Sequence, residues 1–187
     1  MKNSRLNDYI RVYDNALSDV LCDELLMLYK QYPERQIVNG KGKRAGLENS
    51  KWTEMNIGAL GIQPLQQTLL YTIKEYKKKY ESDCNMFALP DPGRYDHLIL
   101  KEYKANTDEC FEVHFDSLLS VSDRYLVLLW YLNDVKEGGE TVFVDLDISV
   151  KPKKGRFLIF PPYWLFRHKA CIPVSDDKYI LSTYLLW

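Results

Sequence analysis

The 187-residue sequence has few histidines, few cysteines and no long apolar run. Its three histidines are His97, His114 and His168, so any histidine chemistry must use these positions. The four cysteines are widely spaced and match neither a zinc-binding pattern nor a dense disulfide scaffold, so we expect reduced thiols. No stretch reaches the roughly 18 apolar residues of a membrane span, and the N-terminus lacks an apolar signal segment. These absences predict a cytoplasmic protein.

An excess of charge of one sign is also missing. Lysine and arginine number 25 and aspartate and glutamate 26, which gives a net charge of −1. A nucleic-acid-binding surface needs an excess of positive charge, so we expect no nucleic-acid partner. The apolar share of 46% and the charged share of 27% are ordinary for a globular chain, and the length suits a single domain.

The first half of the chain has helical patterning. Apolar residues after Ser18 recur at intervals of three and four, which predicts an amphipathic helix with Ser18 as its N-cap and Pro33 beyond its end. A second helix is predicted from about residue 62 to 80. We expect residues from about 1 to 93 to form a helical support, with the glycine-rich segment 39–46 as a lid over a site.

The pattern changes near residue 94, where short runs of strand-forming residues alternate with turn signals. The run 125–132 is apolar throughout, which is typical of a strand buried on both faces. Short strands at this spacing predict an all-β sandwich or jelly roll. The predicted strands are residues 95–103, 125–132, 141–144, 156–160 and 178–187.

Three residues carry potential metal chemistry. On a strand, residues i and i+2 point to the same face, so His114 and Asp116 can reach one ion. With His168 they make the two-histidine, one-carboxylate set of non-haem Fe(II) oxygenases, whereas zinc more often takes other ligand sets. Taken alone, the H-x-D pair favours a surface histidine beside an aspartate over a metal site.

A lysine follows the third candidate ligand. Lys178 lies in a run of tyrosine, isoleucine and leucine, and a lysine that points inward there needs an anion, such as a dicarboxylate. The alternative is an edge-strand lysine that faces water.

The segment 124–143, RYLVLLWYLNDVKEGGETVF, resembles the prolyl 4-hydroxylase-like branch of the Fe(II)/2-oxoglutarate dioxygenases. That branch has a YLNDV–EGGET–F core between an H-x-D pair and a distal histidine, which a basic residue follows. His168 and Lys178 stand at the last two places. The resemblance covers about residues 94–187, and the helical half matches only in outline.

This resemblance implies a mostly β fold, a double-stranded β-helix (jelly-roll) core over 94–187 that the N-terminal helices buttress. His114, Asp116 and His168 would bind Fe(II) and carry catalysis, and Lys178 would hold the distal carboxylate of 2-oxoglutarate. O2 is the second cosubstrate, and ascorbate is a further cofactor that the family implies. Additional cosubstrate contacts are expected from family positions and from alternation along the Lys178 strand, namely Tyr103, Tyr131, Ser182 and Tyr184.

The expected reaction is hydroxylation of a peptidyl proline with release of succinate and CO2. Trp52, Tyr163 and Trp164 are expected to hold an extended, proline-containing peptide. Other functions stay open: the same chemistry on another side chain or a free amino acid, a non-catalytic jelly-roll binding module, and, more distantly, a zinc or cupin-like metalloenzyme. The intact set of three ligands and Lys178 counts against the non-catalytic module.

Overall fold

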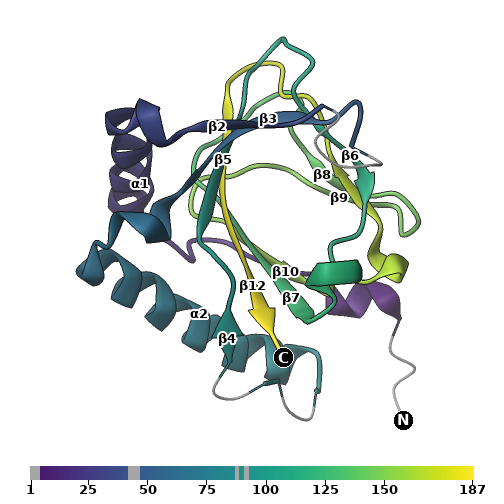
Figure 1. The fold of residues 1–187 in the computed structure, drawn as a ribbon. Helices are drawn as coiled ribbons and strands as arrows, with labels where there is room; N and C mark the ends of the chain where they lie inside the picture. Colours follow the sequence, from purple (N-terminus) through teal and green to yellow (C-terminus); the bar gives the residue numbers. More distant parts are fainter. Residues whose placement is uncertain (1–4, 42–46, 87–88, 91–92) are drawn as a thin grey trace.

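A computed structural model describes residues 5–41, 47–86, 89–90 and 93–187. Two antiparallel sheets form the body of the molecule (Figure 1). The strands within the described residues are β1 (Arg11–Tyr13), β2 (Ile37–Gly40), β3 (Lys51–Asn56), β4 (Arg94–Tyr95), β5 (Ile99–Tyr103), β6 (Phe111–His114), β7 (Arg124–Tyr131), β8 (Thr141–Phe143), β9 (Ile148–Val150), β10 (Phe157–Phe160), β11 (His168–Ala170) and β12 (Lys178–Leu186). The helices are α1 (Asp19–Gln31) and α2 (Gln63–Asp83), with short 3-10 helices at Leu6–Tyr9, Pro33–Arg35, Ile57–Leu60, Leu119–Val121 and Trp164–Phe166.

The larger sheet has the order β1-β10-β7-β12-β5-β3-β2, with β4 beside the end of β12. The smaller sheet has the order β6-β11-β8-β9. The two sheets face each other around a common interior, and α1 and α2 lie on the outer side of the larger sheet (Figure 1). The predicted combination of a mostly β chain with N-terminal helices is confirmed.

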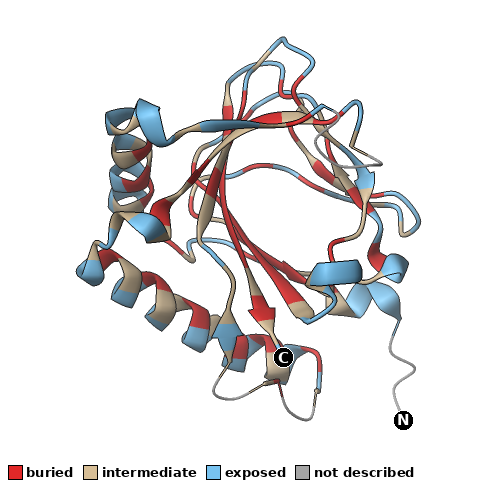
Figure 2. Ribbon diagram, in the orientation of Figure 1, coloured by how far each residue is buried: buried red, intermediate tan, exposed pale blue. Residues whose placement is uncertain are grey.

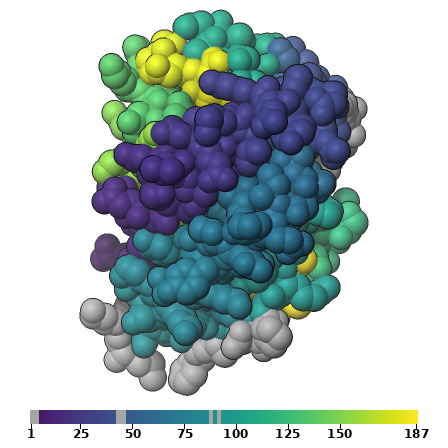
Figure 3. Space-filling model, turned by 90° about the vertical axis from the view of Figure 1, so that its left-hand side faces the viewer, coloured from purple at the N-terminus to yellow at the C-terminus, as the bar shows by residue number. Residues whose placement is uncertain are grey.

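Both predicted helices form. The Ser18 side chain accepts a hydrogen bond from the Leu21 backbone N–H, which confirms the predicted N-cap of α1. α2 continues to Asp83, a little beyond the predicted end. Figure 3 shows the molecule from the left-hand side of Figure 1, and the N-terminal half of the chain covers most of the surface seen there. The helices therefore shield one face of the larger sheet from water.

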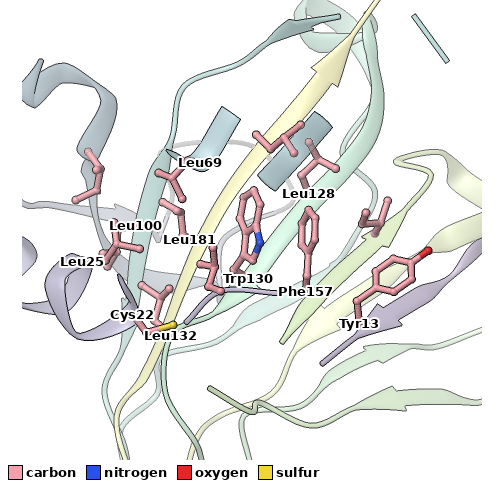
Figure 4. Packing of buried hydrophobic residues seen from close by; sticks show 14 of the residues in the cluster. Tyr13, Cys22, Leu25, Leu69, Leu100, Leu128, Trp130, Leu132, Phe157 and Leu181 are labelled. Atoms are coloured by element: carbon pink, nitrogen blue, oxygen red, sulfur yellow. The ribbon is translucent and has the colours of Figure 1, made fainter. Parts of the chain in front are cut away.

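The central strand β7 is buried on both faces, as its continuous apolar run predicted. Alternate side chains join two clusters: Leu126, Leu128 and Trp130 pack toward the helices, whereas Val127, Leu129 and Tyr131 face the interior between the sheets. On the helix side the rings of Trp130 and Phe157 stack, and residues of α1 and α2 close over them (Figure 4). Figure 2 shows the buried residues concentrated along β7 and β12.

Three strands of the first half were not predicted. β1 pairs with β10, and β2 and β3 extend the larger sheet beyond β5. β1 and β2 have too few residues for a clear alternation, and buried residues do not alternate regularly along β3. The partners of β1 and β3 also lie far away in the sequence. β3 also overturns one expectation: Trp52 is only 3% exposed and packs on Phe111, so it is not a surface residue that holds a peptide.

The expected lid falls partly on residues 42–46, which lie outside the described residues. Residues 39 and 40 belong to β2. All four cysteines are free, as expected. Among the residues that the structure describes, no helix has the length and apolar character needed to cross a bilayer.

Candidate active site

The structure brings the three candidate ligands together. His114 ends β6 and lies opposite His168, which begins β11, in the register of the smaller sheet. Asp116 follows two residues after His114. Its Oδ1 is 3.7 Å from Nε2 of His114, and its Oδ2 is 3.5 Å from Nε2 of His168. The candidate ligand atoms all lie within 4.8 Å of one another, close enough to surround one ion.

Backbone carbonyls orient both imidazole rings. Nδ1 of His114 lies 2.6 Å from the carbonyl oxygen of Glu112, and Nδ1 of His168 lies 3.1 Å from that of Phe166. A carbonyl oxygen can only accept, so each Nδ1 carries the proton and each Nε2 keeps a lone pair. This tautomer, fixed by the second ring nitrogen, is typical of metal-binding histidines.

Asp116 contributes an unpartnered oxygen to the cluster. Its backbone N–H donates to the carbonyl of Pro162, which holds the residue beyond the end of β6. The Tyr184 hydroxyl donates to Oδ1 at 2.8 Å, whereas the buried Oδ2 has no hydrogen-bond partner. A buried carboxylate oxygen without a donor is costly unless a cation compensates it. The donor set therefore fits a divalent metal.

The protonation states also suit a metal. Burial lowers the pKa of His114 to about 3 and holds the pKa of His168 below its ordinary value. Burial alone would raise the pKa of Asp116, but His168, His114 and the Tyr184 hydroxyl outweigh it and bring the pKa below the usual range. At neutral pH the cluster offers two neutral imidazoles and one carboxylate, the forms in which these groups bind metals.

Lys178 lies in the same interior cavity. It begins β12 opposite Tyr103, is fully buried, and its Nζ has no hydrogen-bond partner. The ammonium lies 5.2 Å from the ring centre of Tyr103 and 5.6 Å from that of Tyr131. A buried amine without a counter-ion marks a place for an anion. The narrow cavity, about 30 Å³, connects it with the cluster and is lined by Lys101, Tyr103, Phe111, His114, Asp116, Val127, Leu129, Thr141, His168, Ala170, Lys178, Ile180, Ser182 and Tyr184.

The other predicted contacts occupy different positions. Tyr103, Ser182 and Tyr184 line the cavity. Tyr131 does not line it directly, and its hydroxyl instead donates to Oγ1 of Thr141 at 2.7 Å. Thr141, which faces the cavity, therefore stands between Tyr131 and any molecule bound there.

Two consecutive glycines position the strand that begins at Lys178. Gly138 and Gly139 have φ angles of 76° and 74°, which favour glycine. A Cβ at Gly138 would lie 2.4 Å from the carbonyl oxygen of Ile172, and one at Gly139 would lie 3.4 Å from Cδ of Lys178. The two glycines thus allow the loop between β7 and β8 to pack closely against the segment that precedes β12.

Comparison with known proteins shows which proteins the chain is similar to. A family model described as the 2OG-Fe(II) oxygenase superfamily matches residues 98–186, a segment that contains the cluster and Lys178. This part of the chain is similar to the members of that superfamily. Two Arabidopsis thaliana proteins are among its relatives. Prolyl 4-hydroxylase 2 is 27% identical, with 93% of this chain and 66% of the relative aligned. Probable prolyl 4-hydroxylase 11 is 44% identical, with 74% and 48% aligned.

The chain is thus similar to proteins named as prolyl 4-hydroxylases, and it spans at most about two thirds of their length. A solved structure of a viral collagen prolyl hydroxylase from Paramecium bursaria Chlorella virus-1, titled as a 2OG complex, superposes with a TM-score of 0.65 at 21% identity. The match covers 95% of each chain and confirms the predicted double-stranded β-helix fold.

Several residues that line the cavity were not predicted from the sequence as site residues. Lys101, Phe111 and Thr141 all line the cavity. Alternation along β5 could have found Lys101, because it lies two residues before Tyr103. Phe111 stacks on the ring of His114 with centroids 3.6 Å apart, and no local pattern indicates that contact.

Replacing Lys178 with methionine should reduce the pH dependence of the protein's free energy of unfolding. Burial lowers the pKa of this amine from 10.5 to about 7. Between these values the unfolded chain binds a proton that the folded chain lacks, so the free energy of unfolding rises with pH. The Lys178→Met variant should be more stable than the wild type near pH 7, and its free energy of unfolding should rise less with pH. Urea unfolding of the ligand-free wild type and variant from pH 7 to pH 9 measures this difference. If the free energy of unfolding rises equally with pH in both proteins, the lowered pKa of Lys178 is contradicted.

Proposed function

We propose that this oxygenase hydroxylates a peptidyl prolyl residue, using Fe(II), 2-oxoglutarate and O2 and releasing succinate and CO2. The observation that carries the proposal is one cavity with a three-ligand cluster and an unpartnered buried lysine. The relatives named as prolyl 4-hydroxylases and the viral structure titled as a collagen prolyl hydroxylase support the same chemistry.

In this proposal His114, Asp116 and His168 hold Fe(II). Two histidines and one carboxylate are the ligand set used by non-haem Fe(II) oxygenases, and three protein ligands would leave coordination positions for the cosubstrates. With the cosubstrates, bound iron supplies the oxidising power that replaces a C–H bond by C–OH. The protein's part is to hold the ligands, orient the cosubstrate and exclude water.

Lys178 would bind the distal carboxylate of 2-oxoglutarate. An arriving carboxylate favours the charged amine and compensates the burial that otherwise disfavours it. The Thr141 hydroxyl, held by Tyr131, faces the same space, as do Tyr103, Ser182 and Tyr184.

The substrate peptide would approach along two aromatic residues near Asp116, the half-buried Tyr163 and the exposed Trp164. The Pro162 carbonyl accepts a hydrogen bond from the backbone N–H of Asp116, and Tyr163 and Trp164 follow Pro162 directly. Trp164 is 65% exposed, which leaves its ring available to an extended peptide. The balanced net charge supports a peptide rather than a nucleic acid as the partner. Ascorbate belongs to the proposal only as the reductant, and we assign no residue to it.

A peptide panel tests this function. The protein is incubated with Fe(II), 2-oxoglutarate, ascorbate and O2, together with a proline-rich peptide, the same peptide with alanine for proline, or free proline. We expect one added oxygen atom on a prolyl residue of the first peptide, with one succinate formed per modified residue. Oxygen on another residue or on free proline would overturn the substrate, and the lack of succinate with every substrate would overturn the enzymatic function.

A further inference from the structure

The Tyr184 side chain extends from β12 to the group of candidate ligands His114, Asp116 and His168. Its hydroxyl donates to Oδ1 of Asp116 at 2.8 Å. The other carboxylate oxygen, Oδ2, is buried without a partner and lies 3.5 Å from Nε2 of His168. The two oxygens of one carboxylate thus have different environments before any ion is bound.

Arg124 holds the Tyr184 ring in place. Its guanidinium carbon lies 3.7 Å from the centre of that ring, which is a close cation–π contact. Nη2 donates to Oδ2 of Asp96 at 2.9 Å, and Nη1 approaches the backbone carbonyl oxygen of Asp116 at 3.4 Å. The guanidinium is therefore tied both to the tyrosine and to the residue that the tyrosine contacts.

Asp116 needs such support because it lies beyond the end of β6. Its backbone is held by Pro162, but only side-chain contacts fix the rotation of its carboxylate. A freely rotating carboxylate offers either oxygen to an ion and loses that freedom on binding, which weakens affinity. A donor on one oxygen removes this freedom in advance.

We propose that Tyr184 is a positioning residue of the metal centre, whose hydroxyl restrains Asp116 so that Oδ2 is the oxygen presented to the ion. The inference rests on the proposed function of His114, Asp116 and His168 as metal ligands. It differs from the cosubstrate contact expected for Tyr184 from strand alternation. A residue that only touches 2-oxoglutarate would change the KM for that cosubstrate and leave metal affinity in its absence unchanged.

Co²⁺ titration of the metal-free protein, without 2-oxoglutarate, tests the proposal. Tyr184→Phe removes only the hydroxyl. Tyr179→Phe is the matched control, because Tyr179 lies on the same strand and its hydroxyl bonds to Glu102, outside the cavity lining. Loss of an outer hydrogen bond to a metal ligand typically weakens binding by about 10- to 100-fold. We expect such a loss and an altered visible Co²⁺ spectrum in Tyr184→Phe only.

The results distinguish a failure of the positioning role of Tyr184 from a failure of the proposed metal site. Wild-type affinity and spectrum in Tyr184→Phe would overturn the positioning role, provided that the wild type binds one Co²⁺ and His168→Ala does not. If the wild type binds no metal, or His168→Ala binds as well, the proposed metal site itself fails.

Thermal unfolding of the metal-free Tyr184→Phe protein shows whether this variant folds. If it does not fold, a second variant tests the proposal. Asp96→Asn weakens the anchor of Arg124 and changes none of the cavity-lining residues. We expect weaker Co²⁺ binding in this variant, and unchanged binding would overturn the proposal.

Discussion

Replacement of Asp116 by alanine is expected to reduce hydroxylation and succinate formation below detection while leaving the fold intact. The variant lacks the only carboxylate of the three-ligand cluster. Because Oδ2 has no partner in the metal-free protein, its removal also relieves an uncompensated buried charge. Turnover and Co²⁺ binding are therefore lost together, and the melting temperature of the metal-free protein changes little.

Two variants serve as controls for Asp116→Ala. Asp145→Ala removes an exposed carboxylate that pairs with Arg167, next to His168 in sequence, and should keep full activity. His97→Ala removes the histidine that lies outside the cluster and should also be active. Full activity of Asp116→Ala, or inactivity of both controls, would contradict the assignment of the ligands.

Replacement of Lys178 by alanine is expected to raise the KM for 2-oxoglutarate by about 100-fold or more. Removing one partner of a buried ion pair typically costs roughly 3–5 kcal/mol, and about 1.4 kcal/mol corresponds to a tenfold change in affinity. Lys178 is fully buried and its Nζ has no hydrogen-bond partner in the protein, so this group is available to pair with a carboxylate. Initial rates at increasing 2-oxoglutarate concentration measure the change.

The matched control for Lys178→Ala is Lys169→Ala. Lys169 lies on β11 beside His168 but does not line the cavity, so its loss should leave the KM for 2-oxoglutarate unchanged. Lys178→Arg should keep part of the affinity, since guanidinium also pairs with carboxylates. An unchanged KM in Lys178→Ala would refute the role of this residue.

Several candidate site residues could be predicted from the sequence, because the strands that carry them meet around one interior. β6, β11 and β12 place His114, His168 and Lys178 around one interior, and the resemblance to the family indicated that interior. Asp116 was paired with His114 by strand alternation. In the structure it lies past the strand, where Pro162 rather than the sheet holds it.

Other features depend on long-range contacts that no local pattern encodes. β3 forms a strand only by pairing with β5, and it carries Trp52 inward onto Phe111. The hydroxyl of Tyr131 meets Thr141, and that of Tyr184 meets Asp116, because strands distant in sequence converge on one cavity. Alternation predicted which side chains face inward, but not which polar atoms meet there.

The most direct test of the central claim is an isotope measurement. The protein is supplied with ¹⁸O-labelled O2, Fe(II), 2-oxoglutarate and a proline-rich peptide, and the products are analysed by mass spectrometry. The proposed dioxygenase predicts ¹⁸O in the hydroxyl group of a prolyl residue, labelled succinate, and neither product with Asp116→Ala. Unlabelled hydroxyproline, or modification that proceeds without 2-oxoglutarate, would contradict it.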